Sequence, residues 1–242
     1  VTTIKAVFFV DVITAAVAVF IMLVFLHVPL HAKAREKQTL SYFNDMSEGL
    51  KFIINHKFLK TLFIHCGVYF VLVSPLAFLT PLQVARSFGN DVWRLTVIEV
   101  AYSAGMTAGG IIIAAWGGFK NRLHSMALSN IVCAVCTLAL GIISNFLIYS
   151  LLMVIIGLTL PIFSTPFMVV LQEKVEGDFL GRVFGVLNMI SSSVMPIAML
   201  VFGPLADILK IEWMLIVTGL LMIVQTIFMI KSRVLIEAGK QS

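Results

Sequence analysis

The stretch Glu99-Val-Ala-Tyr-Ser-Ala-Gly-Met-Thr-Ala-Gly-Gly110 places one carboxylate at the head of an otherwise apolar helix that is rich in small residues. The chain of 242 residues is 60% hydrophobic, and only 12% of its residues are charged. Hydrocarbon cannot solvate an ionised carboxylate, so such a side chain usually faces a protein-lined, wet interior. The stretch therefore predicts an all-α, polytopic membrane protein with a polar path through it, and transport is the first functional hypothesis.

Long apolar runs support this fold class. The mean hydropathy is +1.05, and a soluble fold of this length could not hide so much apolar surface from water. A membrane-spanning helix needs about 20 mostly apolar residues. Seven runs qualify, near Val7–Leu30, Thr61–Val84, Leu95–Trp116, Ser125–Ser144, Phe146–Leu171, Val183–Ala206 and Trp213–Ile230.

Basic residues alternate from loop to loop. The loops after the first, third, fifth and seventh runs hold most of the Lys and Arg, whereas the opposite side holds Lys5, Arg86, Arg94 and Lys210. Basic loops remain in the cytoplasm, so we expect a multi-pass protein of the cell membrane with the N-terminus of this piece outside and the C-terminus inside. This loop pattern also explains the net charge of +5 without a nucleic-acid partner.

Signatures of enzymes and metal sites are absent from the sequence. There is no H-E-x-x-H, G-x-S-x-G or G-x-x-x-x-G-K-[ST]. Cys66, Cys133 and Cys136 lie inside apolar runs and are expected to be small packing residues. The sequence predicts neither an enzyme nor a bound cofactor or metal.

Glu99 is the first candidate for a functional residue. At the helical period it shares a face with Ser103, which predicts a polar, cavity-lining face. Gly105 and Gly109 belong to a second stripe, whose small residues let another helix approach closely. The alternative is that Glu99 is an interfacial carboxylate near a helix N-terminus, paired with Arg94.

Other polar and aromatic residues are weaker candidates. Asp11 also lies about one turn inside its helix, where a structural role is favoured over proton coupling. Asn188 and Ser192 stack at i and i+4 and would bind either substrate or a neighbouring helix. Tyr69 and Phe163 offer aromatic faces to a hydrophobic ligand.

A charged segment before the sixth run predicts a conformational latch. Gly181 permits a tight turn there, and Arg182 has the acidic residues Glu173, Glu176 and Asp178 as possible partners. A charge pair where two helices leave the membrane suits a contact that forms in one conformation and opens in another. The alternative is a static surface pair.

The connector after the first run predicts an amphipathic helix over Asn44–Lys57. Leu50, Ile53 and Ile54 share one face, so we expect the helix to lie along the cytoplasmic membrane surface. A regulatory binding segment is the alternative. Prolines at 75, 81, 161 and 166 interrupt the second and fifth runs and predict bends there.

Three stretches together resemble the C-terminal part of a major facilitator superfamily transporter, in the drug-exporting branch that includes macrolide-efflux proteins. They are Glu99–Gly110, Gln172–Phe184 and Phe202–Asp207, and the connector Glu48–Lys57 also resembles this branch. One departure is Gly117-Gly-Phe-Lys-Asn-Arg122, which lacks the acidic residue of the superfamily's G-x-L-x-D-R type loop.

The resemblance implies a layout of domains. Residues 1–30 would be the last helix of the N-terminal bundle and 31–60 the cytoplasmic linker. Residues 61–231 would be the C-terminal six-helix bundle, and 232–242 a cytoplasmic tail. The partners implied are the lipid bilayer, a small hydrophobic substrate and the N-terminal bundle, whose first five helices the chain would lack.

The resemblance also implies a function. It is proton-coupled efflux of hydrophobic or amphiphilic drugs such as macrolides by alternating access, with the proton gradient as the energy source and no cofactor. The helices that line the family's cavity favour Tyr69, Glu99, Ser103, Phe163 and Asn188 over Asp11. The alternatives are a seven-helix receptor or sensor, which would need receptor motifs that are absent here, and a non-transporting membrane scaffold.

Overall fold

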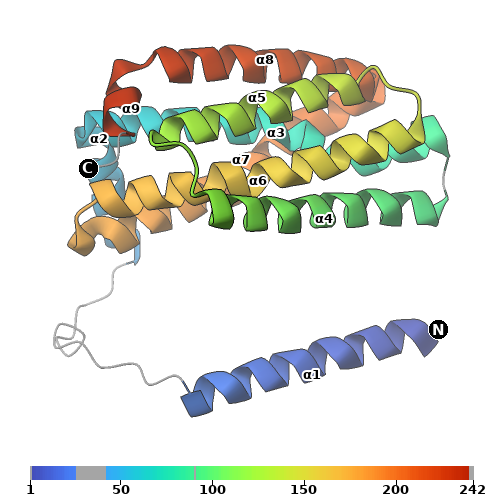
Figure 1. Ribbon diagram of the computed structural model, residues 1–242, viewed down its shortest axis with the longest axis horizontal. Helices are drawn as coiled ribbons and strands as arrows, with labels where there is room; N and C mark the ends of the chain where they lie inside the picture. Colours follow the sequence, from blue (N-terminus) through green and yellow to red (C-terminus); the bar gives the residue numbers. More distant parts are fainter. Residues whose placement is uncertain (1, 26–41, 90, 240–242) are drawn as a thin grey trace. The chain divides into compact units, whose positions relative to one another are not determined.

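The computed structural model describes residues 2–25, 42–89 and 91–239, and this part of the chain is a series of helices joined by short loops (Figure 1). The helices are α1 Thr2–Phe25, α2 Tyr42–Asn55, α3 Lys57–Phe88, α4 Val92–Trp116, α5 Arg122–Leu140, α6 Phe146–Lys174, α7 Gly177–Ile208, α8 Ile211–Lys231 and α9 Arg233–Ala238. The chain divides into two units, Val1–Ser41 and Tyr42–Ser242, so α1 belongs to the first unit and the other helices to the second.

Six helices of the described residues, α3 to α8, are long and apolar enough to cross a membrane. They correspond to the last six of the seven predicted runs. The first run corresponds to α1, in which Val12–Met22 forms a shorter apolar stretch. The predicted all-α membrane bundle is confirmed, and α3 and α7 extend a turn or more beyond their apolar runs.

Local signals in the sequence set several helix ends. The side chain of Asn121 accepts a hydrogen bond from the backbone N–H of Leu123, and Asn145 caps the start of α6 in the same way. Gly117 ends α4 at φ 72°, a left-handed conformation that glycine adopts without a Cβ penalty. These caps keep the connecting loops short.

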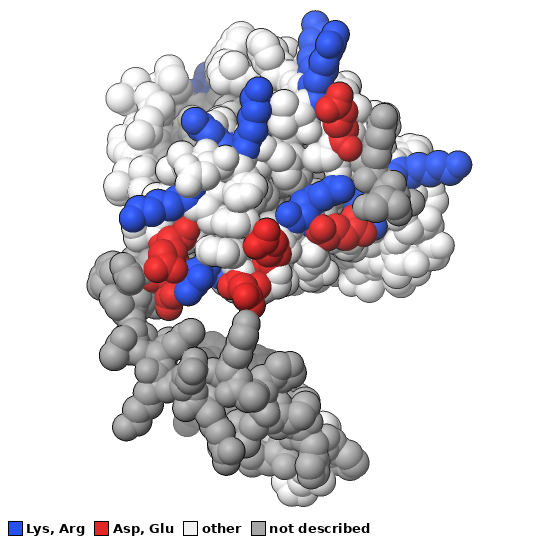
Figure 2. Space-filling view, turned by 90° about the vertical axis from the view of Figure 1, so that its left-hand side faces the viewer, with Lys and Arg blue, Asp and Glu red and all other residues white. Residues whose placement is uncertain are grey.

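Helices α3 to α8 run in alternating directions, so their loops gather at two ends of the unit (Figure 1). Figure 2 looks at one of these ends, where Lys, Arg, Asp and Glu side chains crowd together. Arg122, Lys174, Arg182 and Lys231 belong to loops or helix ends on this side. The described loops after α4, α6 and α8, which the sequence predicts on one side of the membrane, therefore lie together at one end of the bundle.

Glycines set the closest helix contact. A Cβ added to Gly105 of α4 would overlap the carbonyl oxygen of Val154 in α6, and one added to Gly109 would overlap that of Leu158. Gly157 of α6 meets the backbone of α4 in the same way. The predicted packing glycines thus lie where the backbones of α4 and α6 touch.

Proline does not end α3. Pro75 has no N–H to donate to the carbonyl oxygen of Val71, and Ser74 Oγ donates to that oxygen instead, at 2.8 Å. Ser74 is fully buried, so this hydrogen bond satisfies a carbonyl that water cannot reach.

Helix α2, in the connector, packs on the bundle by a different face from the apolar one predicted from the sequence. Gly49, Phe52 and Ile53 turn toward α7 and α3, whereas Leu50 and Ile54 are exposed. Of the three residues predicted to share one apolar face, Ile53 is buried against the bundle and Leu50 and Ile54 are exposed, because α2 meets the bundle by the side that carries Gly49. A Cβ at Gly49 would lie 2.8 Å from the carbonyl oxygen of Arg182.

The predicted C-terminal tail begins with a short docked helix. The backbone N–H of Arg122 donates to the carbonyl oxygen of Gly239 at 3.0 Å, and Asn121 Nδ2 donates to that of Ile236 at 3.0 Å. Leu235 of α9 is fully buried. This part of the tail is therefore an integral part of the bundle.

Candidate functional site

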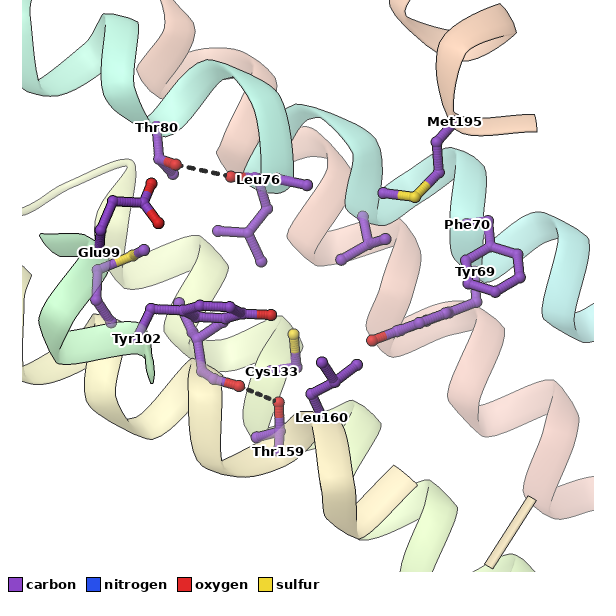
Figure 3. Close-up of a pocket in the computed structure, with 14 residues that line it drawn as sticks. Tyr69, Phe70, Leu76, Thr80, Glu99, Tyr102, Cys133, Thr159, Leu160 and Met195 are labelled. Atoms are coloured by element: carbon purple, nitrogen blue, oxygen red, sulfur yellow. Dashed lines mark hydrogen bonds between the residues drawn. The ribbon is translucent and has the colours of Figure 1, made fainter. Parts of the chain in front are cut away.

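A cavity of about 310 Å³ opens between five helices of the bundle (Figure 3). Its wall is mainly apolar, with hydroxyl groups, one thiol and one carboxylate. The lining residues are Tyr69, Phe70, Val73, Leu76, Ala77 and Thr80 of α3, Glu99 and Tyr102 of α4, Cys133 of α5, Met153, Ile156, Thr159 and Leu160 of α6, and Met195 of α7.

Helix α3 supplies an aromatic wall. The ring of Tyr69 stacks on that of Phe163, with centroids 4.8 Å apart and planes 20° apart. Phe163 stacks in turn on Phe167, at 6.0 Å. Tyr69 thus faces the cavity, while Phe163, which was predicted to line it, supports Tyr69 from behind.

Helix α4 supplies the acidic wall. Glu99 and Tyr102 are three residues apart, so both side chains point to the same side of the helix. The carbonyl oxygen of Tyr102 lies against Gly157 of α6, which fixes the depth at which Tyr102 enters the cavity. Ser103 is a further 100° around the helix and is exposed outside the cavity wall.

Polar groups converge across the cavity. The hydroxyl groups of Tyr69 and Tyr102 point toward one another, with the thiol of Cys133 between them (Figure 3). Thr159 donates to the carbonyl oxygen of Ile156 at 2.6 Å, and Thr80 to that of Leu76 at 3.0 Å. Both threonines therefore present hydroxyl oxygens, which remain available as acceptors for a ligand.

Glu99 is the one carboxylate of the cavity wall, and it has no ion pair within the described residues. Arg94 does not pair with it, contrary to the alternative raised from the sequence. Arg94 instead lies 3.5 Å from Asp91 and over the rings of Trp93 and Phe146. A carboxylate without a protein cation beside an aromatic, apolar wall is suited to bind a proton or an organic cation.

Two more predicted cavity residues lie elsewhere. Asn188 and Ser192 are exposed on α7, whereas α7 reaches the cavity through Met195 alone among the described residues. The predicted substrate contact of these two residues is therefore not made in this cavity. Asp11 belongs to α1, and its side chain lies outside the described part of the chain.

A buried polar cluster that sequence reasoning missed joins three helices. Asn130 Nδ2 of α5 donates to Gln225 Oε1 at 2.7 Å and to Thr226 Oγ1 at 2.8 Å, both on α8. Gln225 Nε2 donates to the carbonyl oxygen of His65 in α3, at 3.2 Å. Asn130 Oδ1 has no partner within the described part of the chain.

Arg182, the basic residue of the predicted latch, has two acidic partners that the sequence did not suggest. Arg182 Nε lies 3.1 Å from Asp45 Oδ1, and Arg182 Nη2 lies 3.3 Å from Glu48 Oε2, so both acids come from α2. Glu173, one of the predicted partners, pairs with Arg122 at 2.6 Å. Asp178 lies in the first turn of α7, and Gly181 is exposed with open space around it.

These features define a multi-pass helical membrane protein with a ligand-sized cavity inside its bundle. The family model described as Major Facilitator Superfamily matches residues 1–199. The chain belongs to this superfamily of membrane transporters, and the resemblance noted from its motifs is confirmed.

Similar curated proteins carry a drug-efflux name. Macrolide efflux protein A of Streptococcus pyogenes is 24% identical over 221 residues, which cover 90% of this chain and 54% of the relative. Macrolide efflux protein A of Enterococcus faecalis is 25% identical over 197 residues, covering 81% of this chain and 61% of the relative. The chain thus spans little more than half the length of these relatives. No solved structure matches it.

Proposed function

We propose that this chain is the second half of a secondary transporter that exports hydrophobic or amphiphilic compounds, such as macrolides, in exchange for protons. The observation that carries the proposal is the cavity itself, in which Glu99, without an ion pair to any described residue, faces an aromatic and apolar wall. The printed names of its relatives, which are macrolide efflux proteins, support the substrate class.

Unpartnered polar faces support a second bundle on the other side of the cavity. Ser103 and Thr107 are exposed on α4, and Asn188 and Ser192 are exposed on α7. Lipid cannot satisfy rows of polar side chains, so these faces are suited to a protein partner or to water. We assign them to the N-terminal bundle, with the substrate held between the two bundles as access alternates.

Glu99 is the proposed coupling residue. When it is ionised it attracts a cationic or polar group of the substrate, and when a proton neutralises it that attraction is lost. Each proton that moves down a membrane potential of 100 mV supplies about 2.3 kcal/mol. Exchange of proton and substrate at one carboxylate would therefore drive export against a gradient.

The test is Glu99→Gln in the full-length transporter, assayed in inverted vesicles for substrate-driven proton movement and for substrate flux. The variant should lose proton-coupled flux at unchanged expression. Glu176→Gln, which removes an exposed carboxylate at the charged end, is the matched control and should keep it. Wild-type coupling in Glu99→Gln would refute the coupling role. The receptor and scaffold alternatives receive no support from the family match.

A further inference from the structure

We propose that α2 presents a basic, partly apolar surface to the headgroups of anionic phospholipids, and that Arg182 strengthens the positive charge of this surface by neutralising the acids of α2. The proposal rests on the membrane-spanning fold and not on the transport function proposed above.

The position of α2 puts it at the edge of the bilayer. Only His56 separates the end of α2 at Asn55 from the start of α3 at Lys57. Helix α3 is long and apolar enough to cross a membrane. A helix joined so closely to a membrane span cannot leave the interface region, so one of its faces meets the headgroups.

The contact with α7 fixes which face that is. Asp45, Glu48, Gly49 and Phe52 all turn toward α7. Phe52 stacks on Phe179, with centroids 4.4 Å and planes 13° apart. These positions recur at the helical period, so α2 cannot roll without breaking all four contacts.

The opposite face is apolar and basic. Leu50 is 43% exposed and Ile54 is 51% exposed, one turn apart. Lys51 is exposed between them in sequence, and Lys57 and Lys60 are exposed at the start of α3. Apolar side chains that dip below the headgroups, flanked by lysines, form the usual pattern of an interfacial helix.

Charge complementarity selects anionic lipids. The acids of the described part of α2 are Asp45 and Glu48, and both are paired with Arg182. Lys51, Lys57 and Lys60 make no ion pair within the described residues. Without Arg182 the two carboxylates would offset two of the three lysines, whereas with Arg182 the full positive charge of the lysines near the junction of α2 and α3 remains. The charged end of the bundle in Figure 2 includes this junction.

The experiment places a fluorescent NBD label at Ser47→Cys, on the exposed side of α2, in the whole chain held in nanodiscs. The native cysteines are buried, so wild-type protein treated with the same reagent measures the background labelling. Nanodiscs of phosphatidylcholine are compared with nanodiscs that contain increasing phosphatidylglycerol. The emission should shift to the blue as phosphatidylglycerol increases, and high salt should reverse the shift.

Two sets of variants test the cause. Each of three variants, Lys51→Gln, Lys57→Gln and Lys60→Gln, should lower the equilibrium constant for association of α2 with anionic lipid about fivefold. Lys120→Gln, on the loop before α5, should leave this constant unchanged. Arg182→Gln should also weaken it, and adding Asp45→Asn with Glu48→Gln should restore it. A merely structural role of Arg182 would not be rescued by removing the two acids.

Equal emission in neutral and anionic nanodiscs, or wild-type behaviour of all three lysine variants, would overturn the proposal. Failure of the rescue would overturn the part assigned to Arg182. Because no substrate or proton gradient is present, these outcomes leave the proposed transport function untouched.

Discussion

Gly105 of α4 lies against the backbone carbonyl of Val154 in α6, closer than any residue with a Cβ could come. Gly109 makes the same contact one turn later with the carbonyl of Leu158, and Gly157 of α6 lies against the carbonyl of Tyr102 in α4. The two helices that carry much of the cavity wall are therefore joined through their backbones.

Gly105→Ala is expected to lower the free energy of unfolding by about 1–3 kcal/mol, because the added methyl group overlaps backbone that cannot move aside. Gly110→Ala is the control, since a Cβ there meets nothing within 4 Å. Unfolding by SDS in mixed micelles, followed by circular dichroism, measures both. Equal stability of the two variants would contradict the close contact.

Ser74→Ala is expected to destabilise α3 by about 1 kcal/mol, because it leaves the Val71 carbonyl without a donor next to Pro75. Thr137→Ala is the matched control. Its hydroxyl also bonds to a buried carbonyl, that of Cys133, which keeps its helical N–H donor. The loss should shrink when Ser74→Ala is combined with Pro75→Ala, and an unchanged loss would reject this account.

Gln225→Leu is expected to cost about 1 kcal/mol in unfolding free energy, because it leaves Asn130 Nδ2 with a single partner, Thr226, in a buried site. The double variant Asn130→Leu with Gln225→Leu should recover part of that loss, since no buried amide is then left unpaired. A double-mutant cycle in the same unfolding assay gives the coupling energy. Strictly additive effects would show that the two amides do not interact.

Tyr102→Leu is expected to weaken binding of the exported compound about tenfold, because the cavity loses an aromatic face beside Glu99. Tyr102→Phe keeps the ring and should stay within about twofold. Tyr149→Phe removes a hydroxyl group from a buried tyrosine outside the cavity wall. It is the control, and its binding affinity should equal that of the wild type. Equilibrium binding to the purified transporter measures all three, and equal affinities of the Leu and Phe variants would rule out a ring contact.

The helices, their alternating direction and the small-residue stripe of α4 could be predicted from the sequence, because each depends on local composition and on the helical period. The rotation of α4 about its own axis could not. Periodicity put Glu99 and Ser103 on one face, whereas contact with Gly157 turns Tyr102 into the cavity in place of Ser103. The spacing of three between Glu99 and Tyr102 was the available signal.

Contacts between segments that are far apart in the sequence could not be predicted either. The acids nearest to Arg182 in the sequence were the predicted partners, but Asp45 is 137 residues away and reaches Arg182 because α2 docks on α7. Likewise, no sequence pattern around Asn130 or Gln225 predicts that α5 and α8 lie side by side. Whether the predicted site residues act in transport stays a prediction for the experiments above.

The glycine contact between α4 and α6 also fixes the register of these two helices. A slip by one residue in either direction would press Ala104 or Met106 onto the backbone that Gly105 now meets. Glu99 and Tyr102 on one helix, and Thr159 on the other, consequently keep constant spacing. Within the described bundle, a helix movement that changes the shape of the cavity must therefore involve α3, α5 or α7.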